Sequence, residues 1–116
     1  MSLLNELENL GVDVNDALKR FMNNSSLYER MLGKLVTTVK DMEVMPFLDS
    51  GDIEKATANA HTLKGVMGNL SITPVYEAYN EIVALLRGNN PDKAKSVLED
   101  ILPVQKNIID CIEKNK

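Results

Sequence analysis

Tryptophan is missing from this 116-residue chain, and aromatic residues make up only 4% of it. Leu, Ile, Val, Met and Ala must therefore fill the core. This favours packed helices, because β-rich chains depend more on aromatic and β-branched residues. A single cysteine, Cys111, excludes a disulfide framework and fits a reducing cytoplasmic setting. One histidine and one cysteine are too few to build a zinc site.

Long apolar runs and nucleotide-binding patterns are missing as well. No stretch approaches the ~18 apolar residues of a membrane span, and none resembles a signal peptide. The net charge is -4 with scattered lysine and arginine, so we expect neither nucleic acid nor a membrane as a partner. The phosphate-binding patterns GxxxxGK(S/T) and GxGxxG do not occur, and no carboxylate cluster suggests a magnesium site. We therefore do not expect an autonomous kinase.

The apolar residues that are present recur at helical spacing, and the breaks fall at recognisable helix caps. Two short helices come first: one ends at Gly11, and another runs from about Asp13 to residues 23–24. Ser25 or Ser26 can cap a third, longer helix. The apolar residues that predict these three helices are Leu3, Leu4, Leu7, Leu10, Ala17, Leu18, Phe21, Leu27, Met31, Leu35, Val39 and Met42.

A proline and a turn separate the third predicted helix from the next. Pro46 lacks the N–H that helix continuation needs, so we expect a kink or break at residues 42–46. Residues 50–52 form a turn in which Asp52 can cap the following helix. The apolar seam of that helix follows alternating steps of three and four, typical of a helix in a bundle. Its members are Ile53, Ala56, Ala60, Leu63, Met67 and Leu70.

Two cap-plus-proline pairs open the last two predicted helices. Thr73–Pro74 begins one that ends at Gly88, and Asn90–Pro91 begins the last one, which we expect Pro103 to bend. Short turns make neighbouring long helices antiparallel. The sequence therefore predicts one all-α domain over 1–116, with an N-terminal helical cap over 1–22 and an up-down four-helix bundle over 25–115.

His61 is the only histidine, and its position on the helix is informative. It follows the core residue Ala60, so it points about 100° away from the seam. Lys64, Gly65 and Gly68 lie three, four and seven residues later and share its face. Each glycine inside a helix costs roughly 1 kcal/mol relative to alanine. Two of them beside a histidine would let the surface of another protein approach the imidazole.

Plain structural explanations exist for each of these residues. A single histidine at the edge of a helix is most often an ordinary surface residue. Gly65 and Gly68 could admit a neighbouring helix of the same domain, and Lys64 could be a solvated lysine. The joint pattern is stronger than any single residue, because both glycines lie on the face of His61 and not on the seam.

The segment AHTLKG at residues 60–65, continued by VMGNL at 66–70, resembles the signature of histidine-containing phosphotransfer domains. Members of that family present a histidine on one helix of a four-helix bundle, with lysine three and glycine four residues later. The resemblance extends over most of the chain, through an N-terminal entry at 11–18, a helix start at 27–29 and the turn at 50–52. Three residues depart from the family pattern. Ser71 stands at the helix exit where glycine is usual, and Pro46 and Pro103 are unusual within the helices of family members.

The resemblance implies a phosphorelay intermediate with His61 as phosphoacceptor and Lys64 as a source of positive charge for the phosphoryl oxygens. Gly65 and Gly68 would lie where a response-regulator receiver domain docks, and a hybrid sensor kinase is a second candidate partner. The chain would act as a cytoplasmic monomer with no cofactor of its own, since the receiver brings the magnesium ion. Two alternatives stay open: a module that only docks receivers, and a general helical scaffold.

Overall fold

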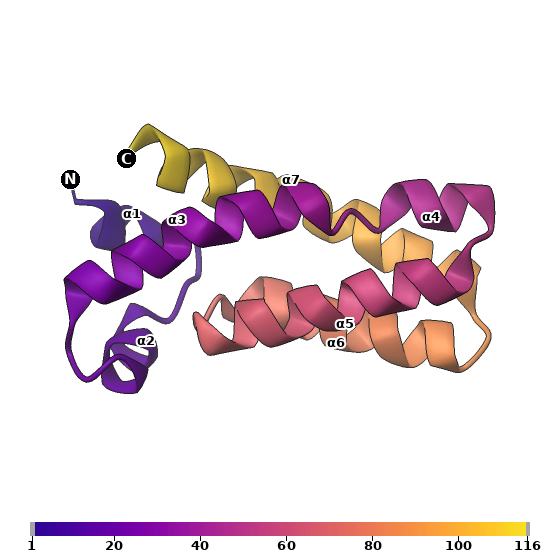
Figure 1. The fold of residues 1–116 in the computed structure, drawn as a ribbon, viewed down its shortest axis with the longest axis horizontal. Coiled ribbons are helices and arrows are strands. Elements are labelled where there is room, and N and C mark those ends of the chain that lie inside the picture. The colour runs from indigo at the N-terminus through magenta and orange to yellow at the C-terminus, as the bar shows by residue number, and fades with distance from the viewer. Residues whose placement is uncertain (1, 116) are drawn as a thin grey trace.

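The computed structural model describes residues 2–115, and over that range the chain is all-helical. Its helices are α1 (Leu3–Asn9), α2 (Val14–Arg20), α3 (Ser25–Asp41), α4 (Met45–Ser50), α5 (Ile53–Asn69), α6 (Thr73–Arg87) and α7 (Pro91–Lys114). Figure 1 shows α3 and α4 in succession along the long axis, with α5, α6 and α7 running beside them in alternating directions. The short helices α1 and α2 lie at the end of the molecule that holds both termini.

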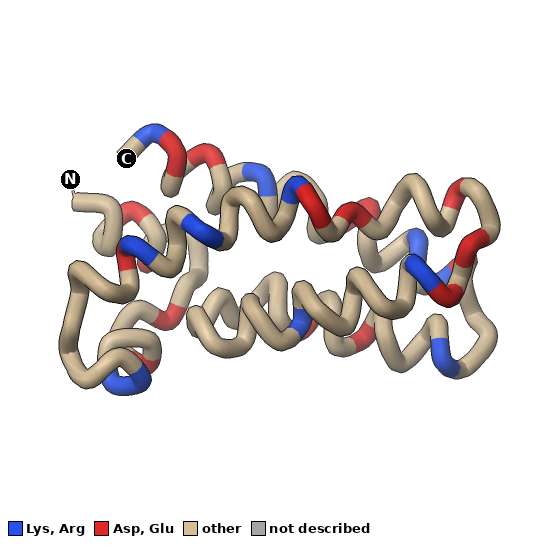
Figure 2. The backbone as a smooth tube through the Cα atoms, in the orientation of Figure 1, with Lys and Arg blue, Asp and Glu red and all other residues tan. Residues whose placement is uncertain are grey.

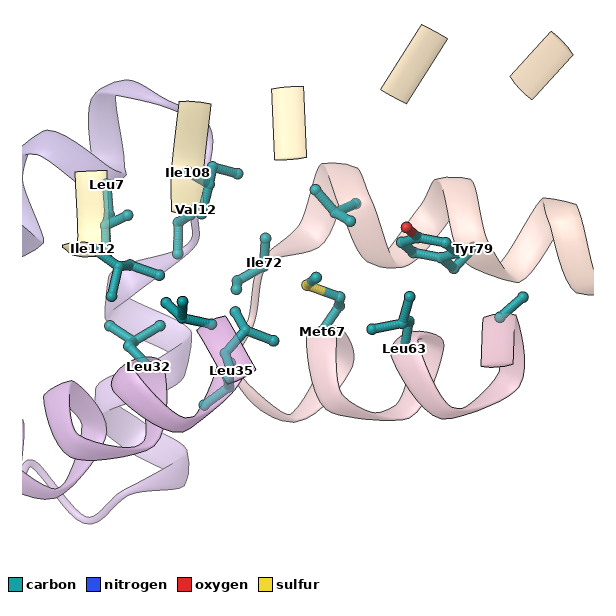
Figure 3. Packing of buried hydrophobic residues seen from close by; sticks show 14 of the residues in the cluster. Leu7, Val12, Leu32, Leu35, Leu63, Met67, Ile72, Tyr79, Ile108 and Ile112 are labelled. Carbon is teal, nitrogen blue, oxygen red and sulfur yellow. The ribbon is translucent and has the colours of Figure 1, made fainter. Parts of the chain in front are cut away.

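The apolar seam predicted for the fourth helix is confirmed, because most of its residues are buried in α5. Ala56, Ala60, Leu63 and Met67 are all almost fully buried, and α6 packs against both α5 and α7. Figure 3 shows the two ends of this core. One end is formed by residues of α1, α3 and α7, and the other by residues of α5 and α6. The labelled side chains include Leu7, Leu32, Leu35, Ile108 and Ile112 at the first end, and Leu63, Met67 and Tyr79 at the second.

The buried face of α3 differs from the expected one. Leu35 is buried as predicted, but Leu27, Met31, Val39 and Met42 are only half-buried. The fully buried residues of α3 are Tyr28, Leu32, Leu35 and Val36, while Met31, Val39 and Met42 pack against the edge of the core. A tyrosine is seldom buried unless its hydroxyl has a hydrogen-bond partner. Here the Tyr28 hydroxyl donates to the carbonyl of Leu70 at 2.8 Å. That distant acceptor could not be anticipated from local spacing.

Two of the expected helix caps are wrong by one or two residues. The cap of α3 is Asn24, whose side-chain oxygen accepts from the Leu27 N–H at 3.0 Å, and not Ser25 or Ser26. At α6 the cap position is Ile72, so Thr73 is already the first helical residue. Asparagine is as good a cap as serine, which is why local preference alone did not decide between neighbours.

The predicted caps at Asp52 and Asn90 are confirmed, and the helix predicted to start near Asp13 is capped by that residue. Asp13, Asp52 and Asn90 each accept a backbone N–H three residues later, which caps α2, α5 and α7. The helix after Asp13 stops at Arg20, earlier than the expected end at 23–24. Met22 and Asn23 have positive φ angles of 55° and 63°, which a right-handed helix cannot hold.

Pro46 marks the expected break, because α3 ends at Asp41 and α4 begins at Met45 with the proline in its first turn. A buried side chain holds this break in place. The amide of Asn59 on α5 donates to the carbonyl of Glu43 at 2.8 Å, and Asn59 is only 2% exposed. The helix α7, in contrast, continues through Pro103.

Polar contacts also tie the two ends of the chain together. The carboxylate of Glu6 on α1 accepts from the Lys114 ammonium at 3.2 Å and from the Asn115 amide at 2.8 Å. The buried Cys111 thiol lies 3.5 Å from the same carboxylate. These partners lower the pKa of Glu6, chiefly through the Asn115 hydrogen bond. The N-terminal helix is therefore fastened to the last turns of α7.

Candidate functional site

The candidate site lies on α5, which the buried seam fixes in one rotational orientation. Ala60 and Leu63 face the core. The residue directly after Ala60 points about 100° away from it around the helix, so it must face outward. The structure places His61 there, with an exposed side chain. Lys64 is half-buried and Gly65 exposed, one helical turn further on. The expected grouping of His61, Lys64 and Gly65 on one face is therefore present.

The side chains of His61 and Lys64 are held by no polar partner among residues 2–115. Neither forms a side-chain hydrogen bond or an ion pair there, whereas Lys40, Lys95, Lys106 and Lys114 all pair with carboxylates. An ammonium group and an imidazole with unused hydrogen-bonding capacity therefore stand side by side on an exposed face.

The two glycines of the stripe have different surroundings. A Cβ atom built on Gly65 would meet nothing within 4 Å, so the space above it is open. A Cβ atom on Gly68 would lie 2.9 Å from Cδ1 and 3.1 Å from Cε1 of Tyr76. The space that both glycines were expected to leave for another protein is therefore open at Gly65, whereas at Gly68 the protein itself fills it. The ring of Tyr76, near the start of α6, rests on the Gly68 backbone.

The exit from α5 is built around Ser71, which stands where histidine-containing phosphotransfer domains usually have glycine. Its φ angle is 57°, in the left-handed region that glycine tolerates best. The Ser71 hydroxyl donates to the Asp16 carboxylate at 2.6 Å, and the Ser71 carbonyl accepts from the Asp13 N–H at 3.0 Å. The exit thus keeps the geometry that favours glycine, while the serine adds a side-chain link to α2.

The Asp16 carboxylate has a second donor. Its Oδ2 atom also accepts from Nε of Arg20 at 2.9 Å. The Ser71 hydrogen bond and, after it, the Arg20 hydrogen bond hold the pKa of Asp16 below its usual range. Asp16 therefore stays ionised at neutral pH and orients the Arg20 side chain near the end of α5.

Substitutions at Ser71 separate the backbone contribution from the side-chain contribution. Alanine and glycine both remove the hydroxyl, but alanine keeps the cost of a positive φ angle. We expect Ser71→Ala to be about 1 kcal/mol less stable than Ser71→Gly in urea unfolding. The native serine should be more stable than the alanine variant, because it keeps the Asp16 contact. Equal stability of the alanine and glycine variants would show that position 71 carries no backbone strain.

Three residues near the site were not predicted from the sequence: Asp16, Arg20 and Tyr76. They line a cleft of about 400 Å³ together with Lys64, Gly65 and Gly68. Within residues 2–115, Tyr76 is one of two large hydrophobic residues that are exposed, at 37%, the other being Met22. Tyr76 lies three residues before the buried Tyr79, so helical spacing alone would place it at the edge of the core. Only the closeness of α2 and α6 to α5 brings these residues to the site.

Comparisons with family models, with curated proteins and with solved structures found no match for this chain. Within residues 2–115, no three His, Cys, Asp or Glu side chains are grouped so that they could hold a metal ion. No helix in the same range is both long and apolar enough to cross a membrane.

Proposed function

We propose that this chain is a phosphorelay intermediate, which accepts a phosphoryl group on His61 from a receiver-domain aspartate and passes it to another receiver. The observation that carries the proposal is the exposed imidazole of His61 beside Lys64, with open space above Gly65. A partner's backbone and its phosphoryl group can approach this face closely, because no side chain stands at position 65.

The reaction would move phosphorus between two nucleophiles. A lone pair on a ring nitrogen of His61 attacks phosphorus, and an N–P bond forms as the P–O bond to the receiver carboxylate breaks. The bonding electrons leave with the carboxylate. Lys64 supplies positive charge to the phosphoryl oxygens, and the magnesium ion belongs to the receiver. Phosphoryl transfer depends mainly on alignment and charge, which suits a rigid helix with an open approach.

The arrangement of the helices supports the same proposal. We interpret α3 with α4, α5, α6 and α7 as the four helices of an up-down bundle over residues 25–115. In this interpretation α1 and α2 form the cap within residues 1–22. The short turns at 51–52 and 88–90 reverse the chain between neighbouring helices. Such a bundle would present His61 from one long helix, and we expect it to act as a cytoplasmic monomer.

Two other functions remain as alternatives. In the first, the chain docks receivers without accepting phosphate, and the intact His61 and Lys64 argue against it. In the second, the chain is a general scaffold, and the unfilled space above Gly65 argues against that, since a scaffold gains nothing from a glycine inside an exposed helix. Incubation with a panel of phosphorylated receiver domains separates the three. Transfer supports our proposal, binding without transfer supports the first alternative, and neither result supports the scaffold.

The phosphate source gives a further prediction. ATP alone should not label the protein, whereas a phosphorylated receiver should label it within the lifetime of its aspartyl phosphate. The label should be lost in acid and retained in base, because a protonated ring nitrogen is a good leaving group. Radiolabelled ATP with no kinase present is the control. Stoichiometric labelling in that control would reveal a nucleotide site and contradict a carrier role.

A further inference from the structure

The cleft beside the His61 face contains one cation, Arg20, that the phosphoacceptor role does not explain. Its volume is about 400 Å³, and two cations, Arg20 and Lys64, line it. Gly65 and Gly68 leave part of it without side chains, and the ring of Tyr76 rests against Gly68. A cleft that is lined by cationic side chains and by glycine backbone has room for an anionic group at the end of a short side chain.

The charge distribution around α5 points the same way. The chain carries 17 acidic residues and a net charge of -4, yet residues 55–76 contain no Asp or Glu. This stretch covers α5 after its first two residues, together with the beginning of α6. Figure 2 shows the distribution of acidic and basic residues along the backbone. The helix that carries His61 therefore has no acidic residue after Glu54, on a protein whose net charge is negative.

The one acidic residue that lines the cleft, Asp16, is already engaged. Its carboxylate accepts from Ser71 at 2.6 Å and from Nε of Arg20 at 2.9 Å. This contact uses one of the five N–H donors of the guanidinium group and holds the side chain at the end of α5. The remaining donors of Arg20 keep the fork geometry that matches a carboxylate.

We propose that this cleft is a socket for an aspartate or glutamate side chain of the receiver domain that docks on His61. The inference rests on the proposed function and names the group that the partner contributes. Gly65 and Gly68 lie roughly 6 and 10 Å along the helix axis from His61, from the rise of an α-helix. A carboxylate in the socket therefore lies away from the reacting phosphorus. Arg20 acts in docking, and it orients the partner without touching the phosphoryl group.

The test compares two arginines in phosphotransfer kinetics, with the receiver that labels the native protein fastest. Arg20→Gln should raise the KM for the phosphorylated receiver roughly tenfold and leave kcat unchanged, since a docking contact acts before the chemical step. Arg30→Gln is the matched control, because Arg30 is an exposed cation on α3 that does not line the cleft. Arg20→Lys should recover only part of the loss, because an ammonium group lacks the planar fork.

Two results of these kinetic measurements would overturn the socket. An equal rise in KM for the Arg20 and Arg30 variants would mean general charge attraction and overturn the socket. A fall in kcat would move Arg20 into the chemistry and also overturn it. Thermal unfolding of each variant checks that folding is retained.

A second measurement does not depend on phosphotransfer. Titration with propionate, followed by NMR at the backbone amides of Gly65 and Gly68, should give saturable shifts in the native protein. The same shifts should persist in Arg30→Gln and disappear in Arg20→Gln. If no receiver transfers phosphate but these shifts appear, the proposed function fails while the carboxylate site stands. If transfer occurs and the shifts are absent from the native protein, the socket is wrong while the proposed phosphotransfer function stands.

Discussion

His61→Gln should abolish phosphoryl acceptance while leaving the protein as stable as before. Glutamine is similar in size and polar, but its amide nitrogen is not a nucleophile that can form an N–P bond. The imidazole is exposed and has no side-chain hydrogen bond within residues 2–115, so its loss should change the free energy of unfolding by no more than about 0.5 kcal/mol. Incubation with a phosphorylated receiver, followed by autoradiography, measures the effect.

The control for this variant is receiver binding. His61→Gln should still bind the receiver, since Lys64, Gly65 and the neighbouring cleft are unchanged. Because the chain has no other histidine, label retained by the variant in acid-labile form would rule out the proposed chemistry. Loss of both labelling and binding would point instead to a change in the surface of α5.

Gly65→Gln should raise stability and impair transfer together. A Cβ atom at this position meets nothing within 4 Å, so the new side chain extends into solvent without a clash. Replacing a helical glycine should stabilise the helix by about 0.5 kcal/mol, from the propensity difference between glycine and glutamine. The same side chain stands where the receiver must approach one turn from His61. We expect kcat/KM for transfer to fall roughly a hundredfold, as for other small misplacements of reacting groups.

Two neighbouring variants sharpen this result. Gly65→Ala should gain up to about 1 kcal/mol of stability and lose less activity, since a methyl group projects less far. Gly68→Ala should behave differently, because its Cβ atom would lie 2.9 Å from the Tyr76 ring and the ring would have to move. Thermal unfolding beside a transfer assay measures all three. A lower unfolding midpoint for Gly65→Gln would mean that position 65 packs against a part of the protein.

The sequence predicted the features that depend on local chemistry. The seam of α5, the break at Pro46 and the caps at Asp52 and Asn90 follow from spacing, from a missing N–H and from side-chain acceptors. Placing His61 on the exposed face required only the seam. These predictions held because each depends on residues within a few positions of one another.

The remaining features depend on contacts between distant residues. Burial of Tyr28 depends on a carbonyl 42 residues away, and the Ser71 hydroxyl finds its acceptor 55 residues away. The two glycines differ because Tyr76 covers only Gly68, which helical spacing cannot reveal. The cleft with Arg20 likewise exists only because α2 packs near the end of α5. Tertiary neighbours, and not helix preference, decided each of these cases.

The fastening of α1 to the end of α7 has a consequence for how the protein opens. Its contacts join residues more than 100 positions apart, so they close the longest loop in the chain. Helix α1 packs against α7 and α2, and its release leaves the contacts among α5, α6 and α7 in place. The end of the molecule that holds the termini can thus fray as a separate cooperative unit. The only thiol lies beneath that unit, so its rate of alkylation reports local opening independently of phosphotransfer at His61.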